Sequence, residues 1–273
     1  MRISVVIPTF NRRQLVTRAI NSVLNQTNSP AEIIVVDDGS TDGTFEHLNK
    51  HFSSTVVLLR CDENRGVSAA RNFGIAHSSG DWIALLDSDD EWLPDKLTQQ
   101  VGYLKQHPLL VCHTNEIWIR NGVRVNQMNK HRKFGGDIFK HCLAMCAMSP
   151  SSILLKKSLV LDTGGFNETF PACEDYDLWL RLCARTPVLY LEQPLIRKYG
   201  GHNDQLSTKH WGMDRFRVRS MDELLQSDTL CEKKRKLTQD MLIKKLAILH
   251  KGAVKHDNQP LLNFCDALFQ KYR

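Results

Sequence analysis

The segment Trp82-Ile83-Ala84-Leu85-Leu86-Asp87-Ser88-Asp89-Asp90-Glu91-Trp92 joins five apolar residues directly to four acidic ones. The apolar run is too short for a buried helix and does not alternate with polar residues, which predicts a strand covered on both faces. Ligands of open α/β sheets bind at the carboxyl ends of strands, where these acids lie. Carboxylates crowded together repel one another unless a divalent cation lies between them. The segment therefore predicts a metal and diphosphate site at Asp87-Ser88-Asp89, or else an acidic turn that caps the helix near Pro94.

The composition is that of an ordinary globular protein, with 42% hydrophobic and 24% charged residues among 273. The first apolar run ends at Pro8, which argues against a signal peptide, and no run approaches the ~20 residues of a membrane span. We therefore expect a cytoplasmic protein whose eight cysteines are reduced thiols. Cys142 and Cys146 have no partner pair at ligand spacing, which disfavours zinc.

The net charge of +6 is confined to the end of the chain. Residues 205–273 contain 14 Lys/Arg and 8 Asp/Glu, whereas residues 1–204 contain 22 of each. We therefore predict a domain over 1–204 and a basic helical extension over 205–273. The extension either packs on the domain with its basic face in water, or its residues 213–255 attach weakly to the anionic inner face of the cytoplasmic membrane. Nucleic acid binding is disfavoured, because few aromatic residues interrupt the basic runs.

Strand and helix patterns alternate through the first hundred residues, which predicts a parallel sheet with helices on both faces. Neither a G-x-G-x-x-G nor a Walker A sequence follows the first strand, so phosphates must be bound by a metal and by basic side chains. Later residues predict a hairpin at Asn121-Gly122 and only helices after about residue 205. The predicted strands or extended segments are 3–7, 32–36, 55–59, 82–86, 109–112, 116–120, 152–155, 188–191 and 195–199. The predicted helices are 15–24, one beginning at 40–42, 67–77, 94–106, 134–148, 174–184, 211–225, 231–250 and 260–272.

Five motifs occur in the order found in one family. They are Val6-Ile7-Pro8-Thr9-Phe10-Asn11-Arg12, Val35-Val36-Asp37-Asp38-Gly39-Ser40, Asn64-Arg65-Gly66-Val67-Ser68-Ala69-Ala70-Arg71-Asn72, Leu86-Asp87-Ser88-Asp89 and Glu174-Asp175-Tyr176-Asp177-Leu178-Trp179. Each motif alone is weak, but the ordered set closely resembles family 2 glycosyltransferases, which are inverting enzymes with a GT-A fold. The resemblance covers about residues 1–200. No Gln-x-x-Arg-Trp sequence follows, so a processive polymer synthase is disfavoured.

The resemblance implies a nucleotide-sugar donor site with a divalent cation, Mn²⁺ or Mg²⁺. Asp38 would accept a hydrogen bond from a base N–H, which suits the uracil of a UDP-sugar. Asp87 would hold the ribose or a metal-bound water. Asp89 and His202 would bind the metal. The full set of donor residues implied is Pro8, Thr9, Asn11, Asp38, Asn64, Gly66, Arg71, Asp87 and Ser88.

The resemblance also makes Asp175 the general base. Inverting transfer needs one carboxylate that takes the proton from the acceptor hydroxyl, separate from the carboxylates at the metal. Glu174 and Trp179 are candidates for orienting this base or contacting the acceptor. The acceptor class implied is a saccharide or a lipid-linked saccharide, as in the synthesis of surface polysaccharides.

Two other functions compete with this interpretation. A nucleotidyltransferase would need a Gly-rich basic loop after the first strand, and Pro8-Thr9-Phe10-Asn11 is not one. A non-catalytic nucleotide-sugar-binding protein is expected to lack an acid at position 89 or 175, and both acids are present.

Overall fold

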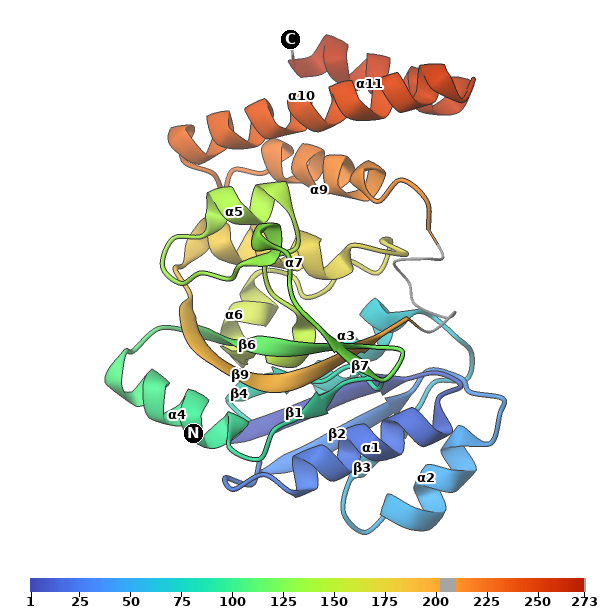
Figure 1. The fold of residues 1–273 in the computed structure, drawn as a ribbon, viewed down its shortest axis with the longest axis vertical. Coiled ribbons are helices and arrows are strands. Elements are labelled where there is room, and N and C mark those ends of the chain that lie inside the picture. The colour runs from blue at the N-terminus through green and yellow to red at the C-terminus, as the bar shows by residue number, and fades with distance from the viewer. Residues whose placement is uncertain (202–209, 273) are drawn as a thin grey trace.

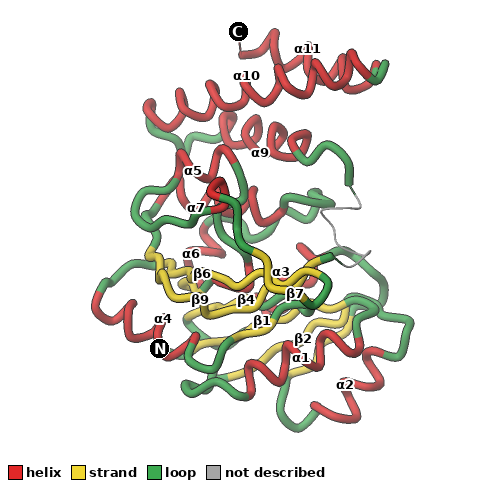
Figure 2. Tube along the Cα trace, in the orientation of Figure 1, coloured by secondary structure: helices red, strands yellow, loops and turns green. Residues whose placement is uncertain are grey.

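The computed structural model describes residues 1–201 and 210–272. Within these residues a nine-stranded sheet has the order β3-β2-β1-β4-β8-β6-β9-β5, with β7 paired to β6 (Figures 1 and 2). The strands are β1 (Ile3–Thr9), β2 (Glu32–Asp37), β3 (Val57–Arg60), β4 (Trp82–Leu85), β5 (Glu91–Trp92), β6 (Val111–Arg120), β7 (Val123–Val125), β8 (Leu154–Lys156) and β9 (Leu189–Gly200). The α-helices are α1 (Arg13–Leu24), α2 (Thr44–Phe52), α3 (Val67–His77), α4 (Lys96–Gln106), α5 (Phe139–Ala144), α6 (Lys157–Asp162), α7 (Glu174–Arg185), α9 (Asp214–Gln226), α10 (Glu232–Lys255) and α11 (Gln259–Tyr272). The short 3-10 turns are η1 (Asn129–His131) and η2 (Pro150–Ser152).

The first four strands are parallel, as predicted. β1, β2 and β4 are covered on both faces, whereas the edge strand β3 is partly exposed. Val5 and Ile7 belong to the core that includes α1, whereas Val6 belongs to the core that includes Ile75 of α3. This two-sided burial explains the continuous apolar runs. Gly74 allows α3 to approach the sheet, because a Cβ there would lie 2.5 Å from Val6 Cγ1. The predicted α/β fold is confirmed.

The second half of the sheet is mixed, which local patterns did not reveal. β8 inserts antiparallel between β4 and β6, and β9 runs parallel to β6. The extended pieces predicted at 109–120 and at 188–199 are two long strands, whose register shifts near Thr114 and Asn115. The helix predicted over 134–148 was wrong except for α5. Gly136 has a φ of 85° and pairs with Val188, which keeps the preceding segment out of a helix.

The C-terminal helices extend the core of the rest of the chain. Val218 of α9 and Leu242 of α10 share one apolar cluster with Trp179 of α7. Figure 1 shows α9, α10 and α11 stacked at the end of the molecule opposite α1 and α2. The proposed boundary at residue 204 lies outside the described residues and stays a prediction. No described helix has both the length and the apolar content needed to cross a membrane.

Part of the C-terminal basic run has a structural role. Lys234 Nζ donates to the carbonyl oxygens of Cys183 and Ala184 at the end of α7. Lys245 forms an ion pair with Asp214 over 2.9 Å. Cations suit helix C-termini, where carbonyl oxygens lack partners. The packing interpretation therefore accounts for some of these charges, although other lysines of α10 remain exposed.

Candidate functional site

The ends of β1 and β2 lie side by side and carry the first two motifs. Pro8 pairs with Val36 inside the sheet, so β1 continues to Thr9 rather than ending at the proline. Thr9 O accepts a hydrogen bond from Asp38 N over 2.9 Å. The buried Thr9 Oγ1 has no hydrogen-bond partner among the described residues. Since buried hydroxyls are normally bonded, this oxygen is suited to contact a ligand.

Asp38 holds the loop before α3 against the end of β2. Its two carboxylate oxygens accept from the backbone N–H groups of Arg65, over 3.0 Å, and Gly66, over 2.8 Å. Burial raises the pKa of Asp38, while these two amides lower it. Gly66 has a φ of 92°, which favours glycine. Asn64 beside it is exposed.

Asn11 joins the first loop to the second. It adopts a φ of 51°, and its Oδ1 accepts from Thr41 N over 2.8 Å. Its own N–H donates to Ser40 Oγ over 2.9 Å. Asn11 does not cap α1, since its side chain binds the loop after β2 instead. These contacts gather the residues predicted for the donor at one edge of the sheet.

Arg71 is the central cation of this edge and is only 3% exposed. It donates to Asp87 Oδ1 over 2.7 Å and to Glu174 Oε1 over 2.8 Å. Burial opposes the charged form, but Asp87 and Glu174 outweigh it and raise the pKa of Arg71. Arg71 thus connects the end of β4 to the start of α7, and Glu174 is the residue of α7 that forms the ion pair.

Asp87, Ser88 and Asp89 follow β4, as the sequence predicted. Asp89 Oδ2 lies 3.1 Å from Arg12 Nη1, which also approaches Ser88 Oγ at 3.5 Å. His202 lies outside the described residues, and the described part of the chain contains no cluster of three or more metal-ligating side chains. Two carboxylates at one strand end nevertheless have the oxygen chemistry that suits Mg²⁺ or Mn²⁺ with substrate phosphates as further ligands.

Asp175 is the second residue of α7 and lines a pocket of about 330 Å³. Its Oδ1 accepts from Tyr176 N over 2.7 Å, and its Oδ2 accepts from the Cys146 thiol over 3.1 Å. Burial, reinforced by the charge of Asp175, raises the pKa of Cys146 well above its ordinary value. The thiol therefore stays protonated and remains a donor to the carboxylate.

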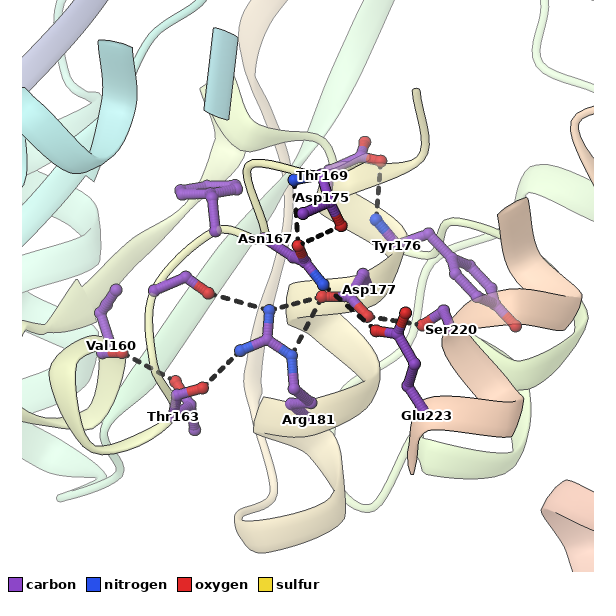
Figure 3. A network of polar contacts seen from close by, with 12 residues as sticks. Val160, Thr163, Asn167, Thr169, Asp175, Tyr176, Asp177, Arg181, Ser220 and Glu223 are labelled. Carbon is purple, nitrogen blue, oxygen red and sulfur yellow. Dashed lines mark hydrogen bonds and ion pairs between the residues drawn. The ribbon is translucent and has the colours of Figure 1, made fainter. Parts of the chain in front are cut away.

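The first turn of α7 is fixed by Asp177 (Figure 3). Asp177 Oδ2 accepts from Arg181 Nε over 3.0 Å, and its Oδ1 accepts from Ser220 of α9 over 2.8 Å. Arg181 also donates to the carbonyl oxygens of Thr163 and Gly165. Asp175 is therefore carried by a helix that is anchored to a loop and to α9.

Trp179 was considered as a residue that orients the base or contacts the acceptor, but its side chain lies in the protein core. It is fully buried, and its Nε1 donates to Met148 O over 2.8 Å. It offers no surface to an acceptor and instead supports Met148, which lines the pocket of Asp175.

Several residues of the site were not singled out from the sequence. Lys198 of β9 lines the same pocket as Asp175. Burial opposes its charge, but Glu116 and Asp90 raise the pKa of Lys198 above its ordinary value. Asp90 is itself buried, and it accepts from Tyr199 N over 3.0 Å. The pairing of β9 with both β5 and β6 brings Lys198, Asp90 and Glu116 together, so the sequence carries no local signal for them.

The chain matches the model of glycosyl transferase family 2 over residues 4–160. An uncharacterized glycosyltransferase of Rickettsia bellii is 30% identical over 67% of this chain and 26% of its own length. The chain thus spans about a quarter of that relative, and it spans 36% of a similar one from Rickettsia felis. WfaP of Escherichia coli, named a UDP-Glc:alpha-D-GlcNAc-diphosphoundecaprenol beta-1,3-glucosyltransferase, is 28% identical over 67% of this chain and 70% of its own.

Solved structures share the fold. S. aureus TarS 1–349 in complex with UDP-GlcNAc superimposes with a TM-score of 0.78 at 21% identity, covering 97% of this chain and 79% of that one. The mannosyltransferase PcManGT of Pyrobaculum calidifontis, in complex with GDP-Man and Mn²⁺, gives 0.64 at 16% identity, covering 97% and 83%. The fold is GT-A, and the family match covers more than half of the sequence. The chain belongs to glycosyl transferase family 2.

Proposed function

We propose that the chain transfers a sugar, with inversion, from a UDP-sugar to a hydroxyl of a lipid-linked saccharide. The observation that carries this proposal is the separation of two kinds of carboxylate. Asp87 and Asp89 lie at the end of β4, whereas Asp175 lines a pocket and is joined to the first group through Glu174 and Arg71. Asp87 and Asp89 are placed to act on the charged leaving group, whereas Asp175 is placed to accept the proton of the acceptor hydroxyl.

The donor is bound at the ends of β1 and β2. Asp38 has lone pairs beyond those that accept from the loop amides, so it can accept the N–H of a uracil ring. Thr9 Oγ1 offers a further buried contact. The structures of TarS with UDP-GlcNAc and the name of WfaP, which uses UDP-Glc, support UDP as the nucleotide.

The leaving diphosphate is placed beside Asp87, Ser88 and Asp89. These residues would hold Mn²⁺ or Mg²⁺, which supplies positive charge to the diphosphate when bound. Arg12 and Arg71 hold the two carboxylates in place. His202 stays a proposed metal ligand on the strength of the family resemblance.

The proton of the acceptor hydroxyl goes to Asp175. Tyr176 N and the Cys146 thiol each donate to this carboxylate and fix its plane. As the acceptor oxygen attacks the anomeric carbon from the face opposite the diphosphate, the bond to the diphosphate breaks and the hydroxyl proton passes to Asp175. Attack from the opposite face gives inversion.

A peripheral position at the inner face of the cytoplasmic membrane would suit a lipid-linked acceptor. Five lysines of α10 are exposed, and Ile248 and Val254 are 57% and 59% exposed on the same helix. The lysines are Lys233, Lys236, Lys244, Lys251 and Lys255. Each basic residue near an anionic bilayer contributes about 1 kcal/mol of attraction. We expect co-sedimentation with anionic vesicles at low salt that disappears at high salt; binding that ignores salt, or no binding, would leave α10 with a packing role alone.

The activity is tested with radiolabelled UDP-glucose and UDP-N-acetylglucosamine, Mn²⁺ and a synthetic α-GlcNAc-diphosphoalkyl acceptor. Transfer of label to the acceptor supports the proposal. A nucleotidyltransferase would instead release pyrophosphate from UTP and a sugar phosphate. A binding protein would retain the UDP-sugar without turnover.

A further inference from the structure

The β6–β7 hairpin and the segment that follows it form a basic surface. Residues 117–136 contain five Lys/Arg and one His but no Asp or Glu. These residues are Arg120, Arg124, Lys130, His131, Arg132 and Lys133. We call residues 117–136 the hairpin surface. The Asn121-Gly122 turn has φ values of 49° and 78°, which fits the tight hairpin predicted there.

One side of the hairpin surface lines the pocket that holds Asp175. Trp118, Arg120, His131 and Lys133 lie on this side of the pocket. The Arg120 guanidinium lies 5.6 Å from the Trp118 ring, and the His131 ring is 5.0 Å from the same indole. The hairpin is therefore continuous with the place where the acceptor hydroxyl must lie.

Within the described parts of the chain, Lys133 is the one cation of the hairpin surface that pairs with a carboxylate. Lys133 forms a buried ion pair with Glu116 over 3.1 Å. Glu116 also accepts from Trp118 Nε1 over 2.7 Å and from Ser149 Oγ over 2.6 Å. Among the described residues, no carboxylate lies within ion-pair distance of the exposed Arg120 and of the three other exposed cations. These three are Arg124, Lys130 and Arg132.

Exposed apolar side chains accompany these charges. Val123 is 64% exposed, Met128 is 56% exposed and Phe134 is 39% exposed. Lone apolar residues on a surface need no explanation, but here three lie within the twelve residues 123–134, which also carry Arg124, Lys130 and Arg132. Positive charge beside apolar side chains suits a molecule that joins phosphates to a hydrocarbon chain.

We propose that the hairpin surface binds the diphosphate and the adjoining lipid of a lipid-diphosphate-linked saccharide, so that its sugar enters the pocket of Asp175. This inference rests on the proposed function and adds the part of the acceptor that the chain recognises. Arg120, which shares one face of the ribbon with Trp118 and Val123 and lines the pocket, binds the phosphate oxygens through charge-assisted hydrogen bonds. Val123 and Met128 contact the first carbons of the lipid.

The experiment measures equilibrium binding, which does not depend on turnover. Fluorescent α-GlcNAc-diphosphoalkyl and an uncharged alkyl α-GlcNAc of the same chain length are titrated against the full chain. The variant Arg120→Gln is compared with a matched control, Lys236→Gln, on the exposed face of α10. We expect the variant to raise the Kd for the diphosphate compound tenfold or more and to leave the Kd for the uncharged compound unchanged. The control should change neither.

Two results would overturn the inference. One is an equal loss of affinity for both compounds, which would indicate a damaged pocket. The other is an unchanged Kd for the diphosphate compound together with lost binding to anionic vesicles, which would assign the surface to the bilayer. UDP affinity, measured in parallel, shows whether the donor site is intact. Failure of sugar transfer with normal acceptor binding would count against the proposed function and not against this surface.

Discussion

The Sγ atom of Cys146 lies 3.1 Å from Oδ2 of Asp175 and donates a hydrogen bond to it. The other carboxylate oxygen accepts from Tyr176 N over 2.7 Å, so both oxygens are held. Because burial raises the pKa of the thiol, Cys146 keeps its proton and acts as a positioning residue for the proposed base.

Cys146→Ala removes this donor, whereas Cys146→Ser keeps one of similar size. We expect the alanine variant to lower kcat about tenfold with the donor KM unchanged, since one hydrogen bond to a charged group is worth about 1.5–3 kcal/mol. Serine should restore most of the rate. The measurement is steady-state transfer from UDP-sugar for the three proteins. Equal rates in all three, or a raised donor KM in the alanine variant, would remove Cys146 from this role.

Arg71 joins the donor edge to the helix of Asp175 through a buried ion pair with Glu174 and a partly buried one with Asp87. Arg71→Met leaves Glu174 without its cation, and breaking a buried pair typically costs about 3–5 kcal/mol. We expect this loss in the free energy of unfolding and at least tenfold weaker UDP binding. Arg60→Met, which breaks an exposed pair with Glu46, is the control and should change stability by less than about 0.5 kcal/mol. A stable Arg71→Met protein with normal UDP affinity would contradict this account.

The contribution of Glu116 to stability can be tested through its dependence on pH. Burial alone would raise the pKa of Glu116. Lys133 and neighbouring hydrogen-bond donors lower it by more, so the net pKa falls from an ordinary 4.5 to about 2. A lowered folded pKa contributes stability that is present above pH 4.5 and is lost as pH falls from 4.5 towards 2. We expect Glu116→Gln to be less stable by about 3–5 kcal/mol at pH 7 because Lys133 is left buried and unpaired.

The difference in the free energy of unfolding between wild type and Glu116→Gln should shrink as the pH falls from 4.5 towards 2. Urea unfolding at pH 7, 5 and 3 measures it. Glu46→Gln, at an exposed position, should show little difference at any of these pH values. A difference between wild type and Glu116→Gln that stays constant with pH would contradict the assignment.

The parallel half of the fold was predictable because its signals are local. The strand at Trp82 ends in acids where the pattern placed them, and α3 has the predicted bounds of Val67–His77. The Asn121-Gly122 hairpin was likewise predictable, since a tight turn demands those residues. The parallel strands and α3 supplied most of the donor edge, whereas the hairpin lies beside the pocket of Asp175.

The rest depends on pairings between distant segments. Lys198 reaches the pocket only because β9 lies beside β6, and Cys146 meets Asp175 only because the segment after α5 packs on α7. Similarly, Lys234 is spaced like a solvent-facing residue but binds the end of α7. No local periodicity encodes such contacts.

The metal site is tested through Asp89. In Asp89→Ala, Asp87 is the one carboxylate left in the Asp87-Ser88-Asp89 motif, and Arg12 loses its ion pair with position 89. We expect Mn²⁺ to strengthen UDP binding to the wild-type protein and to have no effect on the variant, measured by calorimetry with and without EDTA. If Mn²⁺ strengthens UDP binding equally in both proteins, Asp89 does not hold the metal.

The central claim is that Asp175 takes the proton from the acceptor. Asp175→Asn keeps the shape of the side chain and removes its charge. The decisive measurement is transfer from radiolabelled UDP-sugar to the α-GlcNAc-diphosphoalkyl acceptor, made together with the Kd for UDP in the same proteins. The account predicts a UDP Kd within about twofold of wild type and transfer reduced by roughly a hundredfold or more, the usual scale of a general base. Normal transfer by the variant, with or without weakened UDP binding, would contradict it.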